Sequence, residues 1–142
     1  MIDSPETATA CSCAMLRRAS RVLTQRYDQA LRPLGLKLTQ YSLLANLDRA
    51  GPVSITELAR LLVLDRTTLT RNLDTLEKTS LVAIGPGRDR RSREVTLTRR
   101  GRALYRRARP QWQRAERRFR RSLGTADAAQ LRSLLDAVLD KA

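Results

Sequence analysis

The sequence predicts a mainly α-helical fold with one small β-hairpin in its second half. Apolar residues recur every three or four positions through most of the 142 residues, which indicates amphipathic helices. Around residues 82–97 this period gives way to alternation on both sides of a Gly-Pro-Gly turn, which indicates two strands. Two N-cap signals with a short gap predict a pair of short helices directly before that hairpin.

The N-terminal part is predicted to be an arm followed by a long helix. Residues 1–12 are small, polar and aperiodic, so a flexible arm is expected. A helix is predicted over residues 13–36, with Pro33 and Gly35 near its end. Its apolar stripe consists of Leu16, Ala19, Leu23, Tyr27, Ala30 and Leu34.

The next part, residues 37–98, carries the densest local signals. Thr39 is expected to cap a helix that stops at Gly51-Pro52, and Ser54 with Glu57 forms a capping box for a short helix. After a brief turn, Asp65 is expected to cap another helix, whose apolar stripe is Leu69, Leu73 and Leu76. Two short helices so closely spaced predict a helix-turn-helix, and the hairpin behind it predicts a wing.

The C-terminal part, residues 99–142, is predicted to be two helices. Thr98 is expected to cap a long one, Pro110 to kink it, and Gly124-Thr125 to separate it from the last. The terminal helices carry more apolar surface than a small core needs, so an isologous homodimer is predicted. Its expected contacts are Leu16, Leu23, Trp112, Phe119, Leu131, Leu134, Leu135 and Val138.

Composition narrows the function. The net charge is +14, and residues 85–121 alone hold 15 basic and three acidic residues. Such a concentration of positive charge favours binding to a polyanion. The absence of histidine, of a Gly-rich phosphate loop and of paired zinc-ligand cysteines argues against an enzyme, a metal site or a bound cofactor. No apolar run has the length of a membrane span and no signal peptide is recognisable, so we expect a cytoplasmic protein.

The helix that starts at Asp65 is predicted to read double-stranded DNA. With Leu69 facing inward, threonines and one arginine lie on or beside the opposite face, where they can contact phosphates, a thymine methyl or guanine. These candidates are Thr67, Thr68, Thr70, Arg71 and Thr75. In the wing, arginines suit the narrow minor groove, and Asp89 is expected to hold one guanidinium in a bidentate pair. The wing candidates are Arg88, Asp89, Arg90, Arg91 and Arg93.

These segments resemble the MarR family. The run 89–101 is similar to its wing signature, D-x-R followed by V-x-L-T-x-x-G, and residues 68–71 and 76–78 are similar to its recognition helix. The resemblance spans about residues 13–140 and implies a winged-helix homodimer that represses a promoter until a signal releases it. Ser80 departs from the family's usual glycine, which puts the preceding helix end in doubt. Ala83-Ile84 stands where the family often has Glu-Arg, which removes a phosphate contact.

Two kinds of signal follow from the resemblance. Cys13, with Cys11 nearby, is similar in position to the sensing cysteine of hydroperoxide-responsive members, and Tyr27 to a tyrosine that hydrogen-bonds it. Leu38 replaces the second such tyrosine. The other signal that the resemblance implies is a small aromatic acid. Its carboxylate can pair with arginines such as Arg17, Arg18 and Arg21. The sequence also fits two cysteines that have no sensing role, and a constitutive repressor that responds to no ligand.

A basic RNA- or ribosome-binding protein without operator specificity is the alternative function. It accounts for the charge, but not for a capped helix pair followed by a wing. The few aromatic residues mostly lie on apolar helix faces, so stacking platforms for single strands are missing.

Overall fold

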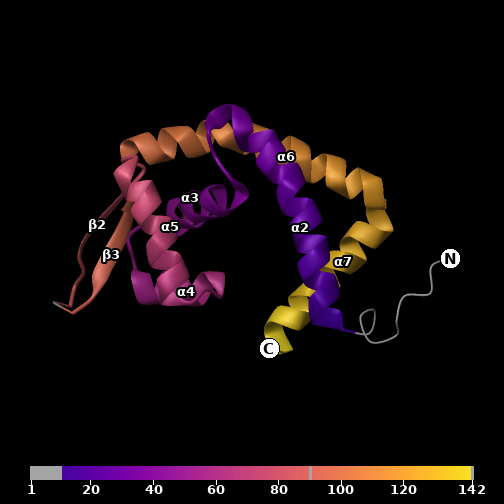
Figure 1. Cartoon of the computed structure of the whole chain (residues 1–142), viewed down its shortest axis with the longest axis horizontal. Coiled ribbons are helices and arrows are strands. Elements are labelled where there is room, and N and C mark those ends of the chain that lie inside the picture. The colour runs from indigo at the N-terminus through magenta and orange to yellow at the C-terminus, as the bar shows by residue number, and fades with distance from the viewer. Residues whose placement is uncertain (1–10, 90, 142) are drawn as a thin grey trace. The chain divides into compact units, whose positions relative to one another are not determined.

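The computed structural model describes residues 11–89 and 91–141, which form helices and one three-stranded antiparallel sheet (Figure 1). Residues 1–10 of the predicted arm, and Arg90 of the predicted wing site, lie outside the described residues. The predicted fold class is confirmed. The elements are α2 (Ser12–Leu31), the short 3-10 helix η1 (Arg32–Leu34), α3 (Leu38–Ala50), β1 (Val53–Ser54), α4 (Ile55–Leu62), α5 (Arg66–Lys78), β2 (Val82–Pro86), β3 (Arg93–Leu97), α6 (Arg99–Leu123) and α7 (Thr125–Lys141).

The described chain forms two compact units. The central unit is Leu31–Arg109, and the terminal unit combines the chain up to Ala30 with the chain from Pro110 onward. The division falls within α6, which continues as a helix through Pro110. The sequence places a boundary at residue 98, whereas the first part of α6 packs into the central unit. Tyr105 contacts Tyr41 with ring centroids 5.5 Å apart, and Ala108 is fully buried.

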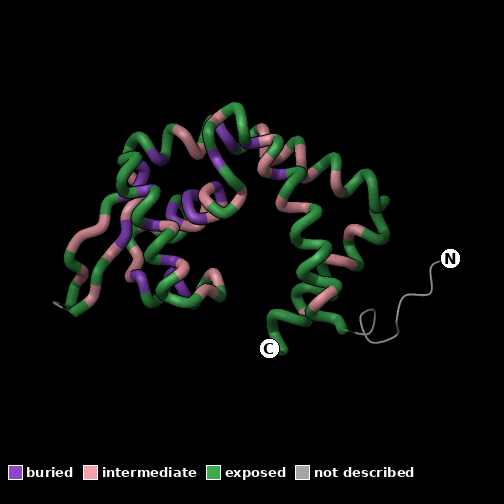
Figure 2. Tube along the Cα trace, in the orientation of Figure 1, coloured by how far each residue is buried: buried purple, intermediate pink, exposed green. Residues whose placement is uncertain are grey.

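The core of the central unit is aliphatic. The apolar stripe predicted for α5 is confirmed, because Leu69, Leu73 and Leu76 have no exposed surface. Leu44 and Leu58, from α3 and α4, are fully buried as well, and Figure 2 shows the buried positions gathered in this unit. Because each of these helices buries one face, their opposite faces remain at the surface.

Strand β1 was not predicted. Val53 pairs with Val95 and Ser54 with Glu94, so β1 extends the β2–β3 hairpin to the order β1-β3-β2. A two-residue strand has too few positions to show alternation, and only the pairing with β3 defines it.

Two predicted caps require correction. Thr39 lies inside α3, whose N-cap is Lys37; the amide of Lys37 donates to the side-chain oxygen of Gln40 at 3.0 Å. Ser54 does cap α4, since its hydroxyl accepts from the amide of Glu57 at 3.1 Å. The reciprocal half of the capping box is replaced by an ion pair, in which Glu57 accepts from Arg60 at 2.6 Å.

The terminal unit is organised around Tyr27, the one buried apolar residue among its described positions. Tyr27 stacks on Trp112 with centroids 6.5 Å apart and donates its hydroxyl hydrogen to Glu116, which also accepts from Arg120 at 2.8 Å. Burial, and next the bond to Glu116, raise the pKa of Tyr27 above its ordinary value. This cluster joins α2 to α6 within the unit.

The stripes predicted for the homodimer remain largely open in the single chain. Leu134 is 57% and Val138 49% exposed, and Leu16 and Leu135 are exposed too. Leu23, Trp112, Phe119 and Leu131 are half-buried. Burying such side chains is favourable, so this unit presents exposed apolar surface that a partner chain can cover.

Candidate nucleic-acid interface

Helix α5 starts at a fully formed cap. One carboxylate oxygen of Asp65 accepts from the amide of Thr68 at 3.0 Å, and the other accepts from its hydroxyl at 2.6 Å. The hydroxyl bond, followed by the amide bond, holds the pKa of Asp65 below its usual range. The predicted cap is therefore confirmed. Thr68, a predicted DNA contact, is half-buried and uses its hydroxyl in the cap.

The outward face of α5 carries most of the predicted contacts. Thr67, Thr70, Arg71 and Thr75 are exposed, and they share one helix with the buried leucines that fix its orientation. No ion pair involving Arg71 is found among the described residues, so its guanidinium is available to a ligand. Asp74 and Lys78 are exposed on the same helix.

The turn between α4 and α5 is strained at Val63. This residue caps α4 with a left-handed φ of 52°, and the amide of Leu64 donates to the carbonyl of Ala59 at 2.9 Å. A β-branched residue rarely adopts this conformation. The Val63 side chain is also 78% exposed, so no burial compensates for the strain.

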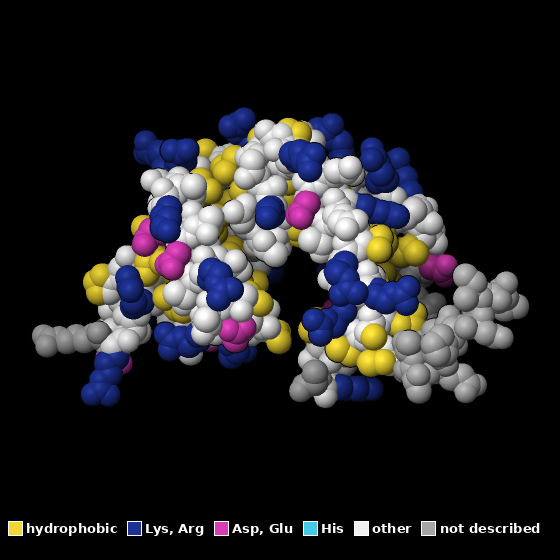
Figure 3. All heavy atoms as spheres, in the orientation of Figure 1, with side chains coloured by type: hydrophobic (Ala, Val, Ile, Leu, Met, Phe, Trp, Pro, Cys, Tyr) yellow, Lys and Arg dark blue, Asp and Glu magenta, His cyan; other side chains and the backbone are white. Residues whose placement is uncertain are grey.

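The wing is the β2–β3 hairpin, in which Ile84 pairs with Val95 and Pro86 with Arg93. At its tip, the amide of Gly87 donates to the carbonyl of Ser92 at 2.9 Å. Arg88 and Arg91 are exposed there, and Arg93 is exposed on β3. Figure 3 shows basic side chains at the outer end of the hairpin, at the lower left of the view.

Asp89 forms hydrogen bonds within the wing turn. Its carboxylate accepts from the backbone amide of Arg91 at 3.4 Å, and its carbonyl accepts from the amide and hydroxyl of Ser92, both at 3.0 Å. Among the described residues it forms no ion pair with an arginine. A short acidic side chain readily bonds backbone two residues ahead, so Asp89 shapes the turn.

The end of α5 is tied directly to the wing. The carboxylate of Glu77 accepts from the amide of Ile84 on β2 at 3.2 Å. Ser80 adopts a φ of 61°, and the amides of Ser80 and Leu81 donate back to the carbonyls of Glu77 and Leu76, both at 2.9 Å. The doubt about this helix end is thereby resolved, because the cap forms with serine in the left-handed conformation. The role of Glu77 was missed, since a glutamate late in a helix gives no sequence signal for a contact seven residues ahead.

The V-x-L-T-x-x-G motif is the joint between wing and α6. Thr98 accepts from the amide of Gly101 at 2.9 Å, which confirms the predicted cap, and donates to the carbonyl of Ser80 at 2.7 Å. A Cβ on Gly101 would lie 2.0 Å from the carbonyl oxygen of Leu81, so no other residue fits without a shift. Val95 is fully buried. These residues hold α5, wing and α6 in one geometry.

The candidate sensing residues lie apart in the structure. Cys11 and Cys13 are exposed free thiols at the start of α2, and the sulfur of Cys11 accepts from the amide of Ala14 at 3.5 Å. Tyr27 lies about four helical turns further along α2 and donates its hydroxyl to Glu116, so it does not contact Cys13.

A cavity of about 350 Å³ lies within the central unit. Apolar side chains from the η1 region and α6 form part of its wall, with Gln40, Thr79 and two arginines adding polar groups. Its lining residues are Leu34, Gly35, Leu36, Gln40, Thr79, Leu81, Arg100, Ala103, Leu104 and Arg107. Such a site suits a small apolar ligand with an acidic group. Of the helices that the structure describes, none has the length and apolarity to cross a membrane.

Comparison with known proteins agrees with this architecture. Residues 34–92 match the model of the MarR family. The chain is 38% identical to the transcriptional regulator MOSR of M. tuberculosis, whose crystal structure is a complex with DNA, over 90% of this chain and 98% of that one, with a TM-score of 0.75. The chain belongs to the MarR family.

Two further members extend the comparison. The transcriptional repressor CouR of Rhodococcus jostii RHA1, solved bound to a DNA duplex, is 28% identical over 98% of this chain and 99% of its own, with a TM-score of 0.86. The transcriptional activatory protein BadR of Rhodopseudomonas palustris is 35% identical over 94 residues, which are 63% of this chain and 54% of BadR. The matched parts span about half to two thirds of the curated MarR-type relatives. These family members are transcriptional regulators, not enzymes.

Proposed function

We propose that this MarR-family protein is a sequence-specific regulator that binds double-stranded DNA as a homodimer on an inverted-repeat operator. The observation that carries the proposal is the outward face of α5, where exposed Arg71 stands among threonines on a capped helix, directly before an arginine-bearing wing. The DNA-bound structures of MOSR and CouR support it.

The proposed reading mechanism uses both elements of the central unit. The exposed residues of α5 enter the major groove, where the guanidinium of Arg71 donates to both acceptors of a guanine and the threonines contact phosphates or a thymine methyl. Arg91 and Arg93 of the wing follow the minor groove, where the negative potential is strongest over A·T-rich DNA. Asp89 contributes by shaping the turn that presents them.

The homodimer is supported by the exposed apolar surface of the terminal unit. Leu134, Leu135 and Val138 lie on one helix and Leu16 on another, and a second copy can bury them all in an isologous interface. Two symmetric copies then present two α5 helices to half-sites about one turn of DNA apart. On this arrangement the protein acts at the nucleoid in the cytoplasm.

We further propose that the protein is a repressor released by a small molecule or an oxidant. The cavity beside Arg100 and Arg107 favours a small aromatic acid, because the arginines pair with a carboxylate while the leucines cover the ring. The exposed thiols Cys11 and Cys13 favour oxidation, since accessible thiols are the ones that react. Operator binding measured with salicylate, and separately with cumene hydroperoxide, distinguishes these signals. If neither weakens binding, release by these two classes is rejected.

The proposed DNA binding is tested by selecting genomic fragments with the purified protein at about 0.15 M salt, where nonspecific binding is suppressed. We expect an inverted repeat with half-sites about one helical turn apart. Loss of binding with rising salt and no enriched motif would contradict the proposal and favour the basic RNA-binding alternative. An operator that overlaps the core promoter of a regulated gene supports repression, whereas one upstream of it indicates activation.

The role of Arg71 is tested by Arg71→Ala against the matched control Arg49→Ala, which removes an exposed charge from α3 of the same unit. Arg71→Ala is expected to lower discrimination at one base pair by about 10-fold or more, because a bidentate guanine contact is lost. The control is expected to retain the full preference. Unchanged selectivity of Arg71→Ala on a randomised-site library rejects the role.

A further inference from the structure

Most of the positive charge of this protein lies outside the surface proposed to read DNA. Helix α6 holds 11 arginines and one acidic residue, a net +10 of the total +14. Helix α5, by contrast, has three basic and two acidic residues. The wing and recognition helix therefore leave the larger part of the charge without a role.

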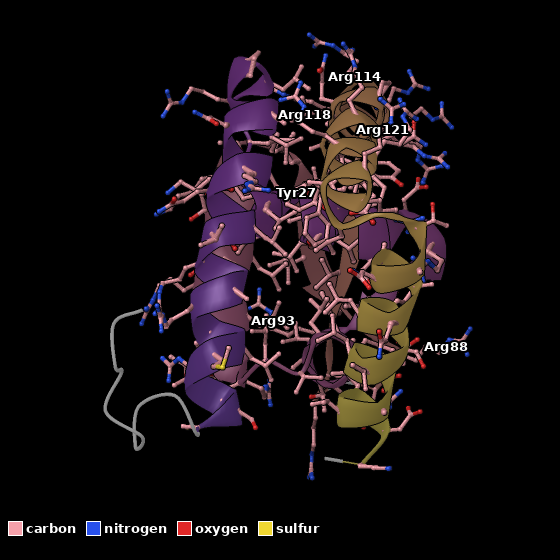
Figure 4. All side chains as sticks on the ribbon, turned by 90° about the vertical axis from the view of Figure 1, so that its right-hand side faces the viewer. Tyr27, Arg88, Arg93, Arg114, Arg118 and Arg121 are labelled. Carbon is pink, nitrogen blue, oxygen red and sulfur yellow. The ribbon has the colours of Figure 1, made fainter. Side chains whose placement is uncertain are left out.

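Within the terminal unit, four of these arginines share one face of α6. Arg114, Arg117, Arg118 and Arg121 follow one another at intervals of three, one and three residues, so they lie within about 100° around the helix axis. We call them the arginine face. All four are exposed, and no ion pair of theirs within 4.0 Å occurs among the described residues. Figure 4 shows Arg114, Arg118 and Arg121 close together on α6, with Tyr27 between α2 and α6.

The arginine face is not needed to build the unit. Trp112, on the opposite side of α6, stacks on Tyr27, and Glu116 is already paired with Arg120. Like charges three or four residues apart destabilise a helix by a few tenths of a kcal/mol per pair. Arginines that serve neither the packing nor an internal ion pair are therefore available to a ligand.

The chemistry of the face favours the phosphate backbone of a duplex. Guanidinium groups form bidentate hydrogen bonds with phosphates, and the step from Arg114 to Arg121 spans about 10 Å, which is about three base-pair steps along the axis of a duplex. The four positions include no aromatic side chain to stack on unpaired bases. They also lack an apolar side chain to enter a membrane, because Trp112 and Phe119 lie on the opposite side of α6.

We propose that the arginine face binds the phosphate backbone of duplex DNA as a second, sequence-independent contact beyond α5 and the wing. The proposal rests on the proposed function in that DNA is the ligand of this protein. It assigns separate tasks to the two units: the central unit determines which sequence is bound, and the arginine face determines how tightly any duplex is held.

The test replaces all four residues with glutamine, which preserves the long stem and the helix propensity. The full-length variant is measured against a selected operator duplex and a scrambled duplex of equal length, at several salt concentrations. Both affinities are expected to fall by the same factor, about 10-fold or more, with the operator preference retained. The slope of log K against log salt is expected to become shallower by about 0.9 for each lost phosphate contact.

The matched control replaces Arg17, Arg18, Arg21 and Arg26 of α2 with glutamine, which removes the same charge from exposed positions of the same unit. This control is expected to change the slope much less. Circular dichroism and sedimentation check that both variants keep their helices and association state. If the quadruple variant does not fold, Arg118→Gln alone is expected to change the slope by about 0.9.

Three outcomes overturn the proposal: an unchanged slope, an equal loss in both quadruple variants, or a loss confined to single-stranded poly(U) or to phosphatidylglycerol vesicles. The failure of the proposed function looks different. In that case the wild-type protein itself shows no operator preference, whatever the arginine face contributes. Arg71→Ala is the reference variant, because it is expected to lower the preference for the operator over the scrambled duplex. The α6 variant is expected to lower the affinity for both duplexes equally.

Discussion

The central and terminal units contain similar amphipathic helices but differ in how they use them. Of the 17 buried apolar residues among the described positions, 16 lie in the central unit and only Tyr27 in the terminal unit. Conversely, eight of the ten large exposed apolar residues belong to the terminal unit. The central unit thus has its own core, whereas the terminal unit offers apolar faces that a second chain can cover. An apolar stripe predicts burial, but not whether the burial occurs within one chain.

The largest effect is expected from charges placed on the terminal faces. Leu134→Asp with Val138→Asp introduces carboxylates into the proposed interface without touching the packing around Tyr27. We expect the dimer dissociation constant to rise about 100-fold or more, because burying an unpaired charge costs at least about 3 kcal/mol. Sedimentation equilibrium measures this.

The matched control is Leu61→Asp, a leucine 46% exposed in the central unit. It is expected to leave the association state unchanged. A dimer that persists in the double variant would show that the interface uses other residues.

A smaller effect is expected where the central unit packs most tightly. Gly101→Ala forces a methyl group against the carbonyl of Leu81, so we expect a destabilisation of about 1–3 kcal/mol. Gly85→Ala, at a glycine with nothing within 4 Å of the added carbon, is the control and should cost little. Urea unfolding followed by circular dichroism compares them. Equal stability of the two variants would contradict the close contact in the joint.

The strained turn of the central unit predicts a gain in stability. Val63→Gly relieves a left-handed β-branched residue and is expected to stabilise the protein by about 0.5–1 kcal/mol. Ser80→Gly, at φ 61°, is expected to act in the same direction. Thr79→Gly, at φ −92°, is the control and should destabilise. A loss of thermal stability in Val63→Gly would show that its side chain has a role that outweighs the strain.

The smallest effect concerns pH and the cap of α5. The pKa of Asp65 is lowered in the folded protein, so the charged cap contributes stability above the pKa of the unfolded chain. That contribution is lost as the pH falls through the folded value, below about 4. Asp65→Asn keeps a neutral cap and is expected to flatten this part of the stability profile. Identical acid profiles for the two proteins would mean that the carboxylate charge is not important there.

The sequence predicted the local structure well because the local signals were strong. Asp65 and Thr98 cap the helices they were expected to cap, and the leucine stripe of α5 is buried as its spacing indicates. Thr39 was wrong because Leu38 continues the same helix, and a threonine one residue later gives the same signal as a cap. Ser80 formed the helix end without glycine, since the surrounding hydrogen bonds impose the left-handed conformation.

The sequence by itself determined the order of the elements, the exposed face of α5 and the position of the wing, because these depend on periodicity, caps and turns between near neighbours. The tertiary structure alone decided what depends on distant residues. It paired β1 with β3, turned the carboxylate of Glu77 to β2 and placed Gly101 against Leu81. It also paired Tyr27 with Glu116, 89 residues away. The Tyr27 hydroxyl, which was expected to hydrogen-bond a cysteine, therefore donates to a carboxylate. Such contacts form only when the packed helices bring separate segments together, and no pattern within either segment records them.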